Sequence, residues 1–169
     1  MYSLNVPVPG SVSRLASDLE PRLTPFETVR DRHSLLAKRF EDGKSPDRHA
    51  LRERLRPVLR DAPAFELRIS GVGAFESPPR GPGPVVYLSV ESPGLRRLHD
   101  RLVEAFGAVE GMEGEGYVPH VTLARGGDVR DPVAQVGGVE SVTWTASSLD
   151  LWSSRSRETV ASIPLLARE

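Results

Sequence analysis

One short segment of the sequence combines a histidine and a hydroxyl residue at a spacing suited to acid-base chemistry on a phosphate. Residues 117–125 read Tyr-Val-Pro-His-Val-Thr-Leu-Ala-Arg. Side chains two positions apart on a strand project from the same face, so a strand here places His120 beside Thr122. The histidine can take or give a proton while the hydroxyl donates a hydrogen bond to a phosphate oxygen. A lone histidine on a strand is more often a half-buried structural residue, so the functional interpretation needs a second group.

An internal repeat supplies that second group. Residues 4–10 and 88–94 share the pattern Leu-x-Val-x-x-Pro-Gly, with an offset of 84. Each copy continues into an apolar pattern with helical spacing and then into a segment with one histidine, His33 in the first copy and His120 in the second. A strand-helix-strand unit that occurs twice tends to pack about a pseudo-twofold axis. The repeat therefore predicts that the two histidines face each other across a groove.

The first copy lacks the complete pairing. Leu35 occupies the position that corresponds to Thr122, and the nearby hydroxyl belongs to Ser34. On a regular strand Ser34 points away from His33, so both reach one phosphate only through a bulge or a local twist. The repeat favours a strand for residues 28–40. An amphipathic helix is the alternative, with one face made of Val29, His33, Leu36 and Phe40.

Strands and helices are predicted along the rest of the chain. Their patterns indicate strands over residues 2–8, 65–69, 85–90, 117–125, 142–145 and 149–152, a final apolar segment at 160–166, and helices over residues 12–23, 45–59 and 92–106. Ser45 is predicted to cap the second helix with Pro46 at its first position, and Pro57 should kink or end that helix. The Pro- and Gly-rich residues 77–84 are predicted to form a turn or a mobile loop.

The composition indicates one globular protein without covalent or metal cross-links. The 169 residues are 38% hydrophobic and 27% charged, which fits a single folded domain over residues 1–169. The absence of cysteine excludes disulfides, thiolate ligands and a Cys nucleophile. The sequence has no metal-ligand spacing, P-loop or dinucleotide motif, so no metal and no cofactor is expected. His49 and His99 lie among charged residues of predicted helices and are interpreted as surface residues.

The charge distribution favours a local rather than a general attraction for phosphates. The formal net charge is -1, which argues against nucleic-acid binding by bulk charge. Residues 30–60 carry ten Lys and Arg against five Asp and Glu, a pattern that is also common on solvated helix faces. The first nine residues lack a secretory signal pattern, and no apolar run is long enough to span a membrane. A soluble cytoplasmic protein is therefore expected.

Taken together, these features resemble the two-histidine (2H) phosphoesterases, the family of 2'-5' RNA ligases and LigT-like RNA 2',3'-cyclic phosphodiesterases. His-x-Thr is the signature of that family and occurs once in each of two pseudo-symmetric halves. Residues 117–125 resemble the second copy closely, and the order of elements fits from Tyr2 to about Leu166. The resemblance implies an α+β fold with two pseudo-symmetric lobes, each a mainly antiparallel β-sheet with outer helices, around a central cleft.

The resemblance also implies a reaction. It implies hydrolysis of 2',3'-cyclic phosphates at RNA ends or on small nucleotides, with His33 and His120 as general acid and base in an order that the sequence leaves open. Thr122 would hold a non-bridging oxygen, where charge develops in the transition state. No metal, membrane or obligate protein partner is implied, and a monomer is expected. The candidate substrate-binding residues are Ser34, Arg125, Tyr117, Arg30, Arg32 and Lys38, with Tyr117 as the candidate to stack on a base.

Two other functions stay open at this point. Leu35 in the first motif is compatible with a binding module that keeps the cleft and grips RNA ends or nucleotides without turnover. A purely structural partner-binding domain would leave the paired histidines unexplained. Loss of hydrolysis on replacing either histidine would favour the enzyme, whereas gradual loss of affinity on replacing arginines would favour the binding module.

Overall fold

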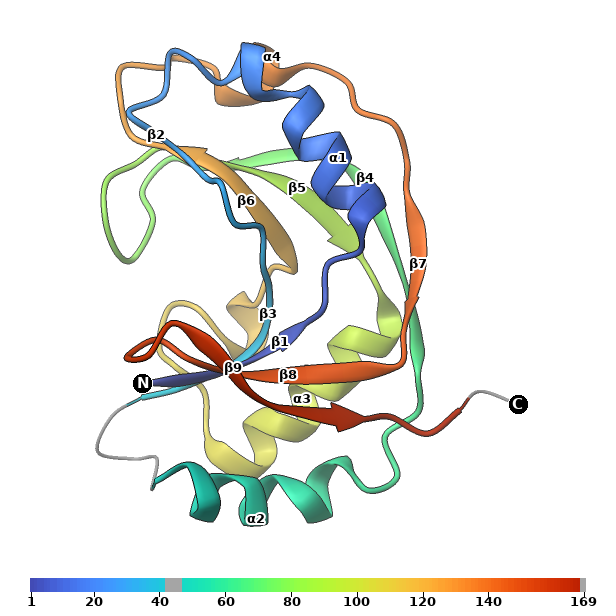
Figure 1. Ribbon diagram of the computed structural model, residues 1–169. Coiled ribbons are helices and arrows are strands. Elements are labelled where there is room, and N and C mark those ends of the chain that lie inside the picture. Colours follow the sequence, from blue (N-terminus) through green and yellow to red (C-terminus); the bar gives the residue numbers. More distant parts are fainter. Residues whose placement is uncertain (42–46, 168–169) are drawn as a thin grey trace.

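The computed structural model describes residues 1–41 and 47–167, which contain both helices and strands (Figure 1). The strands are β1 Tyr2–Val6, β2 Thr28–Val29, β3 Leu35–Phe40, β4 Phe65–Phe75, β5 Val85–Glu91, β6 His120–Arg125, β7 Thr143–Ala146, β8 Ser148–Ser153 and β9 Glu158–Pro164. The helices are α1 Gly10–Asp18, α2 Arg48–Leu59, α3 Pro93–Phe106 and α4 Pro132–Val136, with 3-10 helices η1 Glu20–Arg22 and η2 Gly114–Gly116. The predicted elements outside residues 28–40 are therefore present, with several of their ends shifted.

The described strands form one antiparallel sheet, which confirms the α+β class. The strand order is β7-β4-β5-β6-β3-β1-β8-β9, and β2 pairs separately with β6. This order reads as two four-stranded halves that meet where β6 pairs with β3. In Figure 1, β4, β5 and β6 lie in the upper part of the molecule, and β1, β8 and β9 lie in the lower part. Within the described chain, the junction of the halves has one register pair, Leu35 with Val121.

Helix α3 follows β5 and packs against β3 and β4. The hydroxyl of Ser92 accepts a hydrogen bond from the backbone N of Leu95 and so caps the first turn. Gly107 ends the helix with a φ of 81°, a conformation that favours glycine. Its buried face, which includes Leu98 and Leu102, joins the core between helix and sheet. Neither α3 nor any other described helix has the length and apolar character needed to cross a membrane.

Helix α2 begins later than the sequence predicts. Its N-cap is Asp47, whose carboxylate lies 2.9 Å from the backbone N of Ala50. Asp at this position satisfies a free N–H and faces the positive end of the helix dipole. The predicted cap Ser45 and first helical residue Pro46 lie outside the described residues. Pro57 does not end the helix, which continues for two more residues.

The segment around His33 differs most from the prediction. Strand β2 ends at Val29 and β3 begins at Leu35, and residues 30–34 between them are neither strand nor helix. The predicted continuous strand over residues 28–40 is therefore wrong in its middle part, and the helical alternative is wrong as well. The physical reason is a change of partner, because β2 pairs with β6 whereas β3 pairs along its length with β1.

Both halves of the sheet contain the same irregularity, and it defines which residues are equivalent. In the first half, the register of β1 with β3 shifts directly after Leu36. In the second half, the register of β5 with β6 shifts directly after Thr122. The pair that joins β3 to β6 is Leu35 with Val121. Leu35 directly precedes Leu36, and Val121 directly precedes Thr122. The two β-bulges therefore make Leu36 the counterpart of Thr122, at an offset of 86.

This offset changes the counterpart of His120. With an offset of 86, the counterpart of His120 is Ser34. His33 lies 87 positions before His120 and is therefore the residue directly before that counterpart. The same offset makes Arg39 the counterpart of Arg125. The sequence expectation that Leu35 corresponds to Thr122 is therefore wrong by one residue.

Candidate functional site

A pocket of about 650 Å³ lies between β6, β3 and the loop that joins β4 to β5. This volume is within the range of about 300–1,000 Å³ that is usual for small-molecule sites. His120 and Thr122 line the pocket, and no Asp or Glu of the described residues does so. The cationic lining residues are Arg30, Arg39, Arg80 and Arg125. A lining with these cations and without acidic residues attracts anions.

The ring of His120, at the start of β6, is fixed by its neighbours. Nδ1 lies 2.6 Å from the carbonyl oxygen of Val118, so Nδ1 carries the proton and donates it. Phe75 and Tyr87 both pack against the imidazole, with ring centroids 5.1 Å away in each case. Burial lowers the pKa of His120 and Arg30 acts in the same direction, whereas the hydrogen bond to Val118 opposes them. The ring is therefore neutral at pH 7, with Nε2 as a proton acceptor.

Gly73 on β4 makes room for the tyrosine beside this histidine. Gly73 and Tyr87 are register partners on β4 and β5. A Cβ at position 73 would lie 2.6 Å from atoms of the Tyr87 ring, so any other residue would displace that ring. The glycine therefore contributes indirectly to the position of the imidazole.

Thr122 and Arg125 occupy later positions of β6 on the same wall. In the described part of the chain no group hydrogen-bonds to the Thr122 hydroxyl, which is therefore available to a ligand. Arg125 donates from Nη2 to the carbonyl of Arg80 at 2.5 Å and from Nε to that of Pro82 at 3.2 Å. The predicted ligand residue Arg125 thus lines the pocket and also holds the loop above it.

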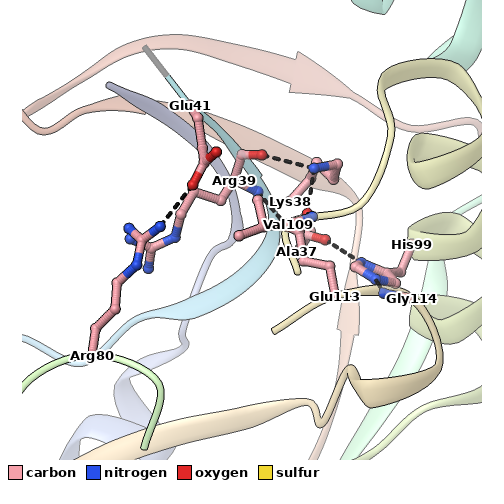
Figure 2. A network of polar contacts seen from close by, with 9 residues as sticks. All are labelled: Ala37, Lys38, Arg39, Glu41, Arg80, His99, Val109, Glu113 and Gly114. Atoms are coloured by element: carbon pink, nitrogen blue, oxygen red, sulfur yellow. Dashed lines mark hydrogen bonds and ion pairs between the residues drawn. The ribbon is translucent and has the colours of Figure 1, made fainter. Parts of the chain in front are cut away.

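The loop predicted at residues 77–84 forms part of the pocket wall. Its Arg80 reaches Glu41 next to the end of β3, with Nη2 and Oε1 2.6 Å apart, and Figure 2 shows this contact. Both side chains are partly exposed, so the ion pair contributes little to stability. It does connect the loop to the side of the pocket that β3 forms.

The wall from β3 differs from the wall from β6 at the counterpart positions. Leu36 stands where β6 has Thr122 and supplies no hydroxyl, whereas Arg39 stands where β6 has Arg125 and also lines the pocket. Nε of Arg39 is buried and has no hydrogen-bond partner among the described residues. Burial and the charge of Arg80 lower the pKa of Arg39. A buried donor without a partner beside a pocket is available to an anion. Sequence reasoning missed Arg39 because the one-residue error in register hid its equivalence to Arg125.

His33, the predicted partner of His120, does not line this pocket. It lies in the irregular segment before β3, and burial lowers its pKa, although the charge of Glu20 on η1 acts in the other direction. Its neighbours Arg32 and Ser34 line a smaller cavity nearby. The main pocket therefore contains one of the two predicted histidines.

Lys38, predicted as a phosphate ligand, belongs instead to a buried network (Figure 2). It is 2% exposed, and Nζ donates to the carboxylate of Glu113 and to the carbonyl of Arg39, the latter at 2.7 Å. The carboxylate also accepts from the backbone N atoms of Arg39 and Val109, each at 2.8 Å. The β-bulge explains the correction, because it turns Lys38 to the inner face of β3. Lys38 therefore holds the 107–117 loop against β3 and is not available to a ligand.

His99 and Tyr117 are also buried, contrary to the sequence interpretation. His99 on α3 is 0% exposed, and its Nε2 accepts from the backbone N of Gly114 at 3.0 Å while Nδ1 donates to the carbonyl of Ala37 at 2.8 Å. Tyr117 stacks on this imidazole with centroids 3.7 Å apart, and its hydroxyl donates to the carbonyl of Leu36. Tyr117 is 5% exposed and lines the main pocket, and His99 covers one face of its ring.

The comparison with known families agrees with this fold. A family model described as the 2'-5' RNA ligase superfamily matches residues 25–158, which include β3, β6 and the loop between β4 and β5. The chain belongs to the 2'-5' RNA ligase superfamily. No curated protein matches the sequence.

Solved structures with the same fold extend the comparison of this 2'-5' RNA ligase superfamily protein. TT0787 of Thermus thermophilus is 20% identical with a TM-score of 0.65, and the match covers 99% of each chain. E. coli LigT complexed with 3'-AMP is 16% identical with a TM-score of 0.70, covering 97% of this chain and 94% of LigT. A structure described as a phosphoesterase is 14% identical with a TM-score of 0.71, covering 98% and 97%. Family and fold together support an enzyme with a phosphoesterase-type function.

The buried His99 of this superfamily member predicts a loss of stability in acid. Both ring nitrogens are already used, so a second proton, on Nε2, would point at the N–H of Gly114. Burial lowers the pKa of His99 and Lys38 acts in the same direction, whereas the hydrogen bond to Ala37 and the charges of Glu113 and Asp100 oppose them. Between the lowered pKa and the usual value of 6.5, the unfolded chain binds more protons than the folded one. The free energy of unfolding should therefore decrease as the pH falls below about 6.5.

Denaturant unfolding at about pH 7.5 and about pH 5 measures this effect. The His99→Leu variant should lose less free energy of unfolding between the two pH values than the wild type. His49→Ala is the matched control, because His49 is exposed on α2, as the sequence predicts, and should behave as the wild type. Equal losses in all three proteins would show that His99 does not contribute.

Proposed function

We propose that this protein hydrolyses 2',3'-cyclic phosphates at RNA ends or on small nucleotides. The proposal is supported above all by the lining of the main pocket. This lining contains the neutral imidazole of His120, the Thr122 hydroxyl, which has no partner among the described residues, and four arginines. Solved structures of E. coli LigT with 3'-AMP, NADP+ and ATP are consistent with a nucleotide ligand that carries phosphate. His120 and Thr122 are the residues that we assign to the reaction on β6.

The geometry of His120 suits it to act as the general base. Its Nδ1–H donates to Val118, which leaves Nε2 to accept the proton of an attacking water. The water oxygen bonds to phosphorus while the bond from phosphorus to one ribose oxygen breaks, and that oxygen takes up a proton from an acid. His33 is the candidate acid from the sequence. Thr122 and the arginines would hold the non-bridging oxygens, where negative charge increases in the transition state.

The direct test uses an RNA oligomer that ends in a 2',3'-cyclic phosphate. The purified protein should open the ring to a single phosphomonoester, which phosphorus NMR detects. We expect the same rate with EDTA present, because the proposed steps use only side chains of this chain. An oligomer that binds but keeps its cyclic phosphate would contradict hydrolysis.

A binding module without turnover is the second candidate function, and the register of β3 favours it. The counterparts of His120 and Thr122 are Ser34 and Leu36, so the first half lacks both the imidazole and the hydroxyl at these positions. The counterpart of Arg125, by contrast, is also a cation, Arg39. Such a pocket keeps the charge that binds a phosphate while lacking a second proton-transfer group on its β3 wall.

Rebuilding the first motif separates these two functions. The double substitution Ser34→His and Leu36→Thr places His-x-Thr at the counterpart positions and should raise turnover by about 10²-fold or more, the lower end of what a positioned acid or base contributes. Leu35→Thr is the control, because it completes His-x-Thr by sequence alone. Leu35 is 0% exposed, so a hydroxyl there should cost about 1–3 kcal/mol of stability without raising turnover. Higher turnover in the control would show instead that the motif that begins at His33 is the operative one.

A further inference from the structure

A second cavity adjoins the main pocket and has a different lining. Its volume is about 190 Å³, below the range of about 300–1,000 Å³ that is usual for a complete ligand site. Leu36 and Arg39 line both cavities, so they form the border between them. A ligand that occupies both cavities would cross this border. The smaller cavity is therefore suited to another part of the same ligand.

Trp152 on β8 gives the smaller cavity an aromatic wall. The guanidinium carbon of Arg32 lies 3.6 Å from the centroid of the Trp152 ring, so a planar cation covers one face of the indole. No Asp or Glu of the described residues lines this cavity. Aromatic rings and arginines in a cationic groove are the combination on which bases of single-stranded nucleic acids stack.

Asn5 on β1 adds a polar group to the same cavity. The residue is 8% exposed, and among the described residues no group hydrogen-bonds to its side-chain amide. Among the described residues, the fully buried side-chain atoms without a partner are Nε of Arg39 and Nε1 of Trp144, so the amide of Asn5 is open to the cavity. The amide offers one acceptor and two donor hydrogens on adjacent atoms, which match the donor and acceptor edge of a nucleobase.

We propose that the smaller cavity binds a nucleobase that is linked to the phosphate in the main pocket. The base stacks on Trp152, next to or in place of the Arg32 guanidinium, and Asn5 hydrogen-bonds to its edge. The base belongs either to the nucleotide that carries the phosphate or to the preceding nucleotide of an RNA strand. This inference rests on the proposed function for its phosphate site, but it requires binding only and not turnover.

The fluorescence of Trp152 tests the inference directly. The chain has two tryptophans, and Trp144 on β7 lines neither cavity, so Trp144→Phe leaves Trp152 as the only indole. Inorganic phosphate, adenosine 3'-monophosphate and an adenosine dinucleotide with a 3'-phosphate are the probes, with binding measured in parallel by calorimetry. Quenching by the mononucleotide assigns the cavity to the phosphate-bearing nucleotide, and quenching by the dinucleotide alone assigns it to the preceding one. Nucleotide binding without quenching, equal quenching by inorganic phosphate, or no nucleotide binding at all would overturn the inference.

Variants of the cavity give a second readout. Trp152→Leu should weaken nucleotide binding about 10- to 100-fold, since stacking on an aromatic side chain contributes about 1–3 kcal/mol per base, and should leave phosphate binding unchanged. Asn5→Ala should reduce the difference in affinity between adenosine and uridine monophosphates. Trp144→Phe is the matched control and should bind as the wild type does. Unchanged nucleotide affinity in Trp152→Leu would contradict the inference even if the ring is hydrolysed, whereas stacking without hydrolysis would contradict only the proposed function.

Discussion

Replacement of His120 by alanine is expected to lower the rate of cyclic-phosphate opening by about 10²- to 10⁴-fold, the usual contribution of a positioned acid or base. The substitution removes the Nε2 acceptor that the Val118 hydrogen bond leaves free. Single-turnover rates with saturating oligomer measure the chemical step without the binding step. Burial lowers the pKa of both His120 and His33, so the optimum of the wild-type rate should lie below the usual histidine value of 6.5. The rate should fall in acid as His120 is protonated and fall at higher pH as the proposed acid His33 loses its proton.

Two further histidine variants make this result specific. His49→Ala should keep the wild-type rate, because His49 is exposed on α2 and lines neither of the two cavities. His33→Ala tests the proposed acid and should also lose activity if His33 donates the proton to the leaving oxygen. A wild-type rate in His33→Ala would remove His33 from the mechanism, and a wild-type rate in His120→Ala would contradict the proposed base.

The second large effect is expected at Glu113, whose loss should lower the free energy of unfolding by about 3–5 kcal/mol. Glu113→Gln keeps the size of the side chain but leaves the buried ammonium of Lys38 without a counter-charge. Both side chains are almost inaccessible, with 2% of the Lys38 side chain and 1% of the Glu113 side chain exposed. Denaturant unfolding of the wild type and of Glu113→Gln at neutral pH measures the difference.

The double variant Lys38→Met with Glu113→Gln should recover much of the lost stability, because neither charge is then buried alone. The exposed pair of Glu53 and Arg56 on α2 is the matched control, with nitrogen and oxygen 3.2 Å apart and about half or more of each side chain exposed. Glu53→Gln should change stability by less than about 0.5 kcal/mol. A small effect of Glu113→Gln would show that the contact with Lys38 is not a desolvated ion pair.

The sequence was sufficient to predict the class of the fold and the β6 side of the site. Alternating apolar residues, the Ser92 cap and the repeated Leu-x-Val-x-x-Pro-Gly pattern act over a few residues, so local propensity and periodicity indicate them. His120 and Thr122 lie on the part of β6 that precedes its bulge, where a spacing of two residues determines the common face. These predictions did not depend on contacts between distant segments.

The β3 side of the site could not be predicted in the same way. The β-bulge of β3 turns Lys38 inward, and the pairing of Leu35 with Val121 makes Leu36, rather than Leu35, the counterpart of Thr122. Nothing in the local sequence marks the position of a bulge, because it is determined by pairing with β1, about thirty residues earlier in the chain. His99 was assigned to the surface because its partners, the backbones of Ala37 and Gly114, contribute no side-chain pattern.

The single register pair between β3 and β6 also has a consequence for the energetics of binding. Leu35 and Val121 alone join the two central strands in the described chain, and the pocket walls from these strands carry Arg39 and Thr122. A phosphate that contacts both of these residues would span the seam between the halves of the sheet. Part of its binding free energy would then hold the halves together, so affinity for the ligand and cohesion of the fold would be thermodynamically linked.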